Sequence, residues 1–358
     1  MAGTVKCPSC SGNLVFDPEK QKLVCEFCGN SYDPAEVESD EKVTRSRDEE
    51  DLKVQDERST GNKEEMQEFI CSSCGATVVT DYSTSATFCS FCGSPAIVGQ
   101  KMSSEFKPDY IIPFKIGKDK AKELFLKWCG GGRMTPVSFV SEKNLEKLTG
   151  LYVPYWLFDS SCHMDRKGGG LEVIREVEFG TVYIYKNDYT VTKSGTYSWK
   201  NIPLDGETKL DDKLMEAIEP YYFEEMVPYD YKYIPGFFAN RYDLKKEDLE
   251  ARAKDRVKSY LDQEFRRGTE HFKTFNTSKN NDSEISLEGH YALLPVWFMN
   301  YKYLGKQYFF AMNGQTGEVA GVAPKSLVKS LIFAAMVLGV AAIAVKIIVG
   351  LILGGFLG

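Results

Sequence analysis

Histidine is scarce in this chain of 358 residues, which contains only His163, His271 and His290. No two of them share a short motif, so the side chain most often used for general acid–base catalysis has no recognisable setting. The pattern GxxxxGK followed by Ser or Thr, which holds nucleotide phosphates, is also absent. These absences predict a protein that is not an enzyme.

A surplus of basic residues is missing as well. The chain has 44 Lys and Arg against 51 Asp and Glu, with a net charge of −7 and a pI near 5.3. Residues 33–68 hold 14 acidic and 6 basic residues, so the rest of the chain is about neutral. For residues 33–68 we expect an acidic, solvated linker or a loosely helical arm. Proteins that bind nucleic acid usually show a basic stripe. The composition therefore disfavours nucleic acid as a partner.

The first residues, MAGTVKCPSC, lack the apolar segment of a secretory signal. We therefore expect the large N-terminal part of the chain to lie in the cytoplasm, where thiols stay reduced. In such a compartment, paired cysteines indicate metal binding more often than disulfides.

Four CxxC pairs then stand out, because the unit C-x2-C-x14-C-x2-C occurs twice before residue 93. Four thiolates close the tetrahedral coordination sphere of Zn²⁺, which is typical of structural and not catalytic sites. The spacing predicts two small four-cysteine zinc ribbons, at residues 1–32 and 69–100, with one structural ion each. The predicted ligands are Cys7, Cys10, Cys25 and Cys28 in the first ribbon and Cys71, Cys74, Cys89 and Cys92 in the second.

Short strands between the cysteine pairs support this prediction. In the first ribbon, residues 13–16 and 22–24 form the expected hairpin, and in the second, residues 77–80 and 86–88 do so. Gly29 follows its cysteine pair directly, where a tight turn needs positive φ.

A long apolar run at the other end predicts one transmembrane helix over residues 330–350, which is about the 20 residues needed to cross a bilayer. Whether this helix extends to residue 357 stays open. Its one ionisable residue, Lys346, can reach the interface with its long side chain. Lys325 and Lys329 flank the near end and favour a single-pass protein of the cell membrane with its N-terminal part in the cytoplasm.

Oligomerisation through this helix also stays open. Gly350, Gly354 and Gly355 are small enough for close helix packing, although glycine is common in membrane helices.

Residues 106–324 show a repeated order of strand, helix and strand, which predicts a duplicated α+β domain with halves at 106–205 and 228–324. Each half ends with a predicted hairpin. The expected strands are 110–114, 151–158, 233–238 and 291–298, the helices 118–128 and 245–267, and the hairpins 182–199 and 300–319, the second turning at 313–317. Pro154 and Pro295 interrupt two of these strands, which predicts positions at the margin of the sheet.

Other features of this region favour structural roles. Cys162 and His163 are neighbours in an expected strand, so their side chains point to opposite faces and are poorly placed as nucleophile and base. The glycine runs 130–132 and 168–170 predict loops. Asp211 is expected to cap the helix that follows it.

Several segments resemble one bacterial family. These are Cys89–Pro95, Pro108–Lys115, Gly150–Asp159, Leu210–Pro220 and Tyr233–Phe237. The chain is similar to the C-terminally anchored membrane proteins of Gram-positive bacteria known as transcription-factor-IIB-type zinc-ribbon proteins, some of which carry a primosomal-helicase-like label. The resemblance implies recruitment of phage-shock-protein-A-like or flotillin-type partners to the membrane during envelope stress.

Together these features predict a non-enzymatic, membrane-anchored zinc-ribbon adaptor that recruits cytoplasmic proteins. The first alternative is a membrane-tethered protein that binds nucleic acid, for which salt-sensitive binding by residues 1–100 would speak. The second is an enzyme that uses the aromatic domain as a pocket, for which a deep polar cleft with convergent acids would speak.

Overall fold

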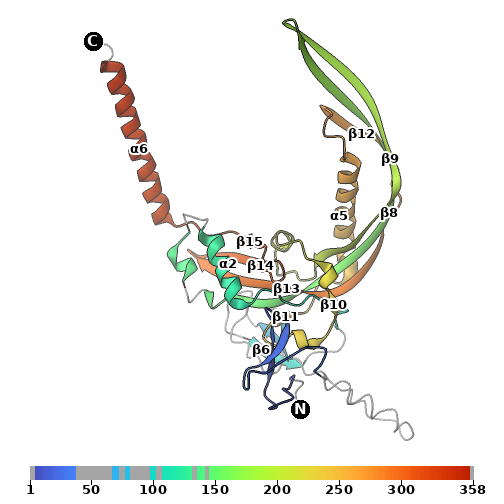
Figure 1. Ribbon diagram of the computed structural model, residues 1–358, viewed down its shortest axis with the longest axis vertical. Helices are drawn as coiled ribbons and strands as arrows, with labels where there is room; N and C mark the ends of the chain where they lie inside the picture. The colour runs from blue at the N-terminus through green and yellow to red at the C-terminus, as the bar shows by residue number, and fades with distance from the viewer. Residues whose placement is uncertain are drawn as a thin grey trace.

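The computed structural model describes residues 5–37, 67–71, 77–80, 97–101, 107–130, 135–141 and 145–354. It is a mixed α and β structure, as the sequence predicts, and its strands form two sheets. A long hairpin and one long helix extend from the body on the same side, while the N-terminal strands lie on the opposite side (Figure 1).

The first sheet is the N-terminal ribbon. It is antiparallel, with strands β1 (Leu14–Asp17), β2 (Lys22–Cys25) and β3 (Ser31–Tyr32). Asp17 makes the β1–β2 turn, since its Oδ1 accepts hydrogen bonds from the backbone N–H groups of Glu19 and Lys20 at 3.0 and 3.1 Å. The predicted hairpin of this ribbon is confirmed.

The second sheet holds 12 of the described strands. Its main path runs β10-β7-β13-β8-β11-β5-β4-β6, and β9, β12, β14 and β15 attach beside it. These strands are β4 (Gln67–Cys71), β5 (Thr77–Thr80), β6 (Ile97–Lys101), β7 (Tyr110–Ile111), β8 (Thr149–Glu178), β9 (Thr181–Asp205), β10 (Val227–Pro228), β11 (Phe238–Asn240), β12 (Thr274–Asn280), β13 (Ser286–Tyr303), β14 (Lys306–Asn313) and β15 (Val319–Gly321).

The centre of this sheet is the antiparallel pair β8–β13, in which Val153 lies opposite Leu294. The two strand–helix–strand segments interlock around it. β11 runs parallel to β8, with Phe238 opposite Leu151, and β7 runs parallel to β13, with Tyr110 opposite Ala292. Each half thus pairs its short first strand with the long strand of the other half. The halves therefore share one sheet, while their origin by duplication stays a prediction.

Both prolines lie in the two central strands, so the prediction of marginal positions is wrong. The physical reason is that the neighbouring strand ends beside each proline. The Pro154 carbonyl accepts a hydrogen bond from the N–H of Gly206, just after β9. The Pro295 carbonyl accepts one from the N–H of Gly314, just after β14, and both N···O distances are 2.8 Å. Each proline therefore lies where the hydrogen-bonded ladder with the neighbouring strand ends. Its missing N–H group leaves no carbonyl of a paired strand without a hydrogen bond.

Helices α2 (Lys118–Gly130) and α5 (Lys246–Arg266) confirm the two predicted helices to within two residues. α5 buries residues spaced by four along one face, which are Leu249, Ala253, Val257, Leu261 and Phe265. A tryptophan of each half also makes a hydrogen bond to the backbone just before the helix of the other half. The Trp156 indole donates to the Leu244 carbonyl before α5, and the Trp297 indole donates to the Ile116 carbonyl before α2, both at 2.9 Å.

Short helical turns complete the body. They are η2 (Val137–Val140), α4 (Asp212–Glu216), η3 (Phe223–Glu225) and η4 (Tyr231–Tyr233). Asp211 caps α4 as predicted, with its side chain accepting from Leu214 N–H at 3.0 Å.

The predicted hairpins have different turns from those expected. β8 and β9 reverse at Phe179 and Gly180, and β13 and β14 reverse at Leu304 and Gly305, each turn with two positive φ angles. Residues 182–199 are therefore one strand, and the turn at 313–317 joins β14 to β15. The turn of the first hairpin was wrongly predicted because β8 continues far beyond the apolar residues that marked it as a strand.

Gly168, Gly169 and Gly170 lie inside β8, so the loop prediction for them is wrong. A Cβ at Gly168 would lie 2.8 Å from the Phe275 ring, and one at Gly170 would clash with the Phe272 ring. These two glycines let aromatic rings pack directly on the strand. The described end of the other run, Gly130, closes α2.

The ribbon packs against the body and is not a separate domain. Phe16 N–H donates to the Pro235 carbonyl at 3.2 Å, and the Phe16 ring meets Tyr233 edge-on at 5.1 Å. Ribbon residues Leu14 and Leu23 share one buried cluster with Phe114 of the body. Burial of apolar area at about 25 cal/mol per Å² holds the two parts together.

The start of the predicted linker joins this contact too. Val37 is buried, and Lys232 Nζ donates to the Pro34 carbonyl at 2.8 Å. The ribbon unit thus continues past residue 32. Most of the predicted linker, residues 38–66, lies outside the described residues, and the end of the predicted segment begins β4.

Helix α6 (Leu327–Gly354) contains the predicted span and begins three residues before it. Within it, residues Leu327–Val349 are long and apolar enough to cross a membrane, and the most apolar stretch among them has no residue buried against the described chain. At 1.5 Å per residue, the 28 residues of α6 measure about 42 Å, more than the hydrocarbon thickness of about 30 Å.

Gly236 offers a direct test of the ribbon contact. Its φ is +96°, and an added Cβ would lie 2.7 Å from Val15 Cγ1 of the ribbon. Gly268 has a similar φ of +82° with nothing within 4 Å. We expect Gly268→Ala to cost about 1 kcal/mol and Gly236→Ala measurably more, in urea unfolding. Equal losses would contradict a tight ribbon–body contact.

Glu207 gives a pH-dependent test. Burial and the neighbouring Asp243 raise the pKa of its carboxyl to about 7, despite Lys209 Nζ at 3.5 Å. Because the folded pKa lies above the unfolded one, this group favours folding below about pH 4.5 and loses that contribution as pH rises towards 7. Glu207→Gln should therefore stabilise the protein at pH 8 by on the order of 1–3 kcal/mol and change little at pH 4. The exposed Glu123→Gln serves as control, and parallel pH profiles for both variants would refute the prediction.

Candidate metal centre

Two matching turns carry the cysteines of the N-terminal ribbon. In the first, Ser11 N–H donates to the Cys7 carbonyl and Cys7 N–H to the Gly12 carbonyl, both at 2.8 Å. In the second, Gly29 N–H donates to the Cys25 carbonyl and Cys25 N–H to the Asn30 carbonyl, both at 2.9 Å. Because the two turns have the same backbone hydrogen bonds, both sulfur atoms of each cysteine pair point towards one position.

The positive φ predicted at Gly29 is confirmed at 75°, and Ser11 holds the equivalent position at 60°. Sequence reasoning missed Ser11 because serine carries no glycine-like signal. It also missed Gly12, where a Cβ would lie 3.2 Å from Cys25 Sγ and 3.3 Å from Cys10 Sγ. The glycine thus lets the two turns approach.

The four sulfurs of Cys7, Cys10, Cys25 and Cys28 all lie within 4.8 Å of one another. Cys7 Sγ is 3.6 Å from Cys28 Sγ, and Cys10 Sγ is 3.5 Å from Cys25 Sγ. Tetrahedral zinc with Zn–S bonds near 2.3 Å requires sulfur separations of about 3.8 Å. The donor set therefore fits zinc in number, element and spacing.

Electrostatics in the cluster also favour a cation. The Gly12 amide lowers the pKa of Cys10, but burial and the three neighbouring sulfurs outweigh it and raise that pKa to about 12. Burial raises the pKa of Cys7, yet hydrogen bonds from Tyr32 and backbone amides outweigh it and lower that pKa to about 6. Four thiolates so close together repel one another, and a bound divalent cation removes the repulsion.

With zinc bound, all four positions of the metal would be filled by cysteine, which leaves no position for water or substrate. Tyr32 orients the first cysteine turn, because its Oη lies 3.4 Å from Cys7 Sγ and 2.6 Å from Ser9 Oγ. The arrangement suits a structural centre.

The second cysteine set is only partly described. Cys71 ends β4, while Cys74, Cys89 and Cys92 lie outside the described residues. Of its predicted hairpin, residues 77–80 form β5 as expected, and residues 86–88 are not among those described. A second zinc ion stays a prediction.

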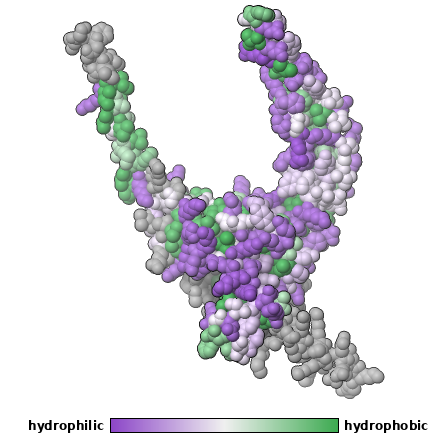
Figure 2. Space-filling model, in the orientation of Figure 1, coloured by the Kyte–Doolittle hydropathy of each residue, from purple (hydrophilic) through white to green (hydrophobic). Residues whose placement is uncertain are grey.

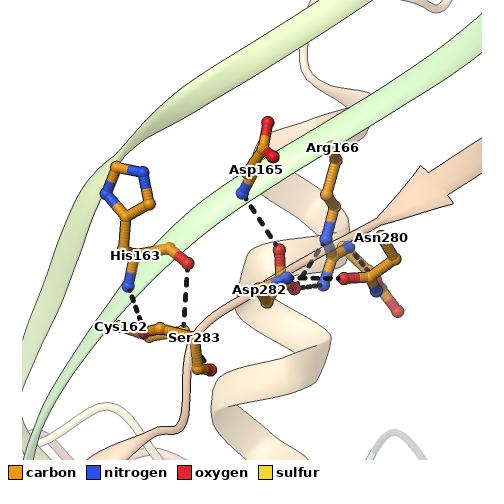
Figure 3. A network of polar contacts seen from close by, with 8 residues as sticks. Cys162, His163, Asp165, Arg166, Asn280, Asp282 and Ser283 are labelled. Carbon is orange, nitrogen blue, oxygen red and sulfur yellow. Dashed lines mark hydrogen bonds and ion pairs between the residues drawn. The ribbon is translucent and has the colours of Figure 1, made fainter.

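Cys162 and His163 point to opposite faces of β8, as predicted. Cys162 is buried and its Sγ lies 3.4 Å from the Ser283 carbonyl oxygen (Figure 3). The His163 ring lies 3.3 Å from Thr196 Oγ1 on β9. The two side chains cannot act on one substrate.

Beside this pair, the buried Arg166 binds Asp262 of α5 and Asp282, with Nε 2.8 Å from Asp282 Oδ2 (Figure 3). Sequence reasoning missed this network, since its members are far apart in the chain. It fixes α5 and the β12–β13 loop to the base of the β8–β9 hairpin.

Cys10→Ser tests the centre. We expect the purified full chain to lose one equivalent of zinc relative to the wild type, because three thiolates bind zinc far more weakly than four. The matched control is Cys129→Ser, a buried free cysteine on α2. Elemental analysis by mass spectrometry measures the metal, and unchanged zinc in Cys10→Ser would rule the site out.

Comparison with known proteins agrees with this description. A family model described as Trm112p-like protein matches residues 4–33, the segment that carries the four cysteines. The uncharacterized protein YdjG of Bacillus subtilis (strain 168) is 31% identical over 351 residues, covering 98% of each chain. No solved structure matches. The chain therefore belongs to the same protein family as YdjG.

Proposed function

We propose that this protein is a non-enzymatic, membrane-anchored zinc-ribbon adaptor that recruits cytoplasmic proteins to the membrane. The observation that carries the proposal is the arrangement of its two ends. The cysteine ribbon lies on the side of the body away from α6, so a protein held in a bilayer by α6 presents the ribbon to the aqueous phase (Figure 1).

The orientation follows from charge and redox chemistry. Lys325 and Lys329 lie at the near end of α6, and basic residues favour the cytoplasmic side of a span. Zinc-binding thiolates also need a reducing compartment. We therefore place the body and the ribbon in the cytoplasm and α6 in the cell membrane.

The ribbon offers one apolar contact for a partner. Phe27 lies between Cys25 and Cys28 and is 85% exposed. Its backbone belongs to the turn that the metal would fix, so the ring stands on a rigid support and loses little entropy on binding. Exposed aromatic rings on rigid supports are common anchors of protein interfaces.

The partner classes come from the family resemblance of the sequence. Membership of the transcription-factor-IIB-type zinc-ribbon membrane family would make phage-shock-protein-A-like or flotillin-type proteins the partners, and envelope stress the setting. The acidic net charge of −7 supports a protein partner over nucleic acid.

Affinity purification from solubilised membranes, followed by mass spectrometry, tests the adaptor role. We expect a cytoplasmic protein to co-purify with the wild type and to be lost from Phe27→Ser, because removal of the ring deletes the anchor. Leu304→Ser, which changes an exposed residue at the β13–β14 turn, is the control. The double variant Cys71→Ser, Cys74→Ser shows whether the second cysteine set contributes.

Recovery of the same proteins with wild type and both ribbon variants would overturn the adaptor role. Salt-sensitive binding of DNA or RNA by the full chain, lost in the same variants, would favour the nucleic-acid alternative instead.

A further inference from the structure

The β8–β9 hairpin extends far from the body on the side from which α6 also projects (Figure 1). Its base is three-stranded, because β12 pairs with β8 from Arg166 to Leu171. Beyond Leu171 no other described strand pairs with the hairpin. We call residues 172–187 the hairpin tip.

The hairpin tip exposes apolar side chains among polar ones (Figure 2). Phe179, at the turn, is fully exposed, and Val177 is 67% and Ile184 58% exposed. The other exposed apolar or aromatic side chains of the tip are Ile174, Val182, Tyr183 and Tyr185. Such a group at the end of a projecting hairpin has no packing role in the described body.

The register sorts these side chains by face. Val177 lies opposite Val182 and Arg175 opposite Ile184, so these four share one face. Glu176 and Glu178 occupy the other face, opposite Tyr183 and Thr181. Ile174 lies opposite Tyr185 on this second face and Val173 lies opposite Lys186 on the first, so both faces combine apolar and charged side chains, with Phe179 at the end of the tip.

The hairpin and α6 are both fixed to the body. Arg166 ties the hairpin base to α5 and to Asp282, and the rings of Phe272 and Phe275 pack on its glycines. At the start of α6, Lys329 Nζ donates to the Thr135 carbonyl at 2.7 Å. The directions of both projections are thus set by specific contacts.

A flat surface drawn from the start of α6 to the hairpin tip leaves the body on one side and α6 on the other (Figure 1). We propose that the hairpin tip inserts Phe179 and its neighbouring apolar side chains into the leaflet nearer the body, in the same bilayer that α6 crosses, as a second membrane contact. This rests on the membrane anchoring by α6 proposed above. Tyr183 and Tyr185 would lie at the interface, where tyrosine is enriched.

Insertion of this kind is driven by apolar side chains and not by charge. The hairpin tip contains Arg175 and Lys186 against Glu172, Glu176 and Glu178, so no basic cluster is present to attract anionic lipid. The contact should therefore form on neutral lipid and persist at high salt. Two fixed contacts would hold the body at a set tilt and distance from the membrane.

Tryptophan quenching in the full chain tests the proposal. The protein is reconstituted in nanodiscs of phosphatidylcholine with or without brominated acyl chains, which quench tryptophan on contact. Phe179→Trp reports on the tip, Thr190→Trp on an exposed position lower on the same hairpin, and Phe333→Trp on α6. The emission of the four native tryptophans is subtracted with the parent protein.

We expect the added emission of Phe179→Trp and Phe333→Trp to be blue-shifted and lost in brominated lipid, at low and high salt alike, while that of Thr190→Trp is kept. Quenching at Phe333→Trp without quenching at Phe179→Trp overturns the tip contact and leaves the anchor standing. In that case a blue-shifted Phe179→Trp assigns the tip to a second copy of the chain. Absence of quenching at Phe333→Trp refutes the anchor itself, and with it this proposal.

Discussion

The antiparallel pairing of β8 with β13 is the constraint on which the rest of the structure depends. Every other part of the body is placed relative to this pair. β7 and β11 flank it in matching register, and α2 and α5 are each fastened by an indole from the opposite half. A shift of one residue between β8 and β13 would turn every buried side chain of both strands towards the wrong face. The two halves therefore cannot fold as separate domains, although each follows the same order of elements.

The ribbon depends on this body as much as on its cysteines. Small ribbons bury little apolar area, and their folding usually relies on the metal. Here the hydrophobic side chains of β1 and β2 continue into the cluster around Phe114 and Phe237. The candidate metal centre and the sheet thus share one hydrophobic cluster, while Phe27 stays exposed at the second cysteine turn. This union gives the proposed partner surface a fixed position relative to the membrane side of the molecule.

In the adaptor that we propose, function would depend on how the two ends of the molecule are placed. The closed cysteine set faces one way, while α6 and the long hairpin face the other (Figures 1 and 2). Ion pairs of the buried Arg166 with Asp282 and of the buried Asp205 with Arg252 brace the two strands of the long hairpin against the body. The proposed adaptor role would need such bracing, because a partner bound at one end would be held at a fixed distance from the bilayer only if these elements are rigid.

The sequence by itself determined the features that rest on local spacing. The CxxC pairs specified a four-sulfur cluster, the apolar run specified a helix long enough to cross a membrane, and the periodic segments specified α2 and α5. Turn chemistry, residue period and ligand number act over a few residues, so they are visible without a fold. The tertiary structure decided how these parts meet. Pro154 and Pro295 lie in central strands because their neighbouring strands end beside them. Two glycines of β8 let aromatic rings pack on the strand, and the ribbon packs onto the body. These outcomes depend on contacts between residues far apart in the chain, whose pairing no local pattern encodes.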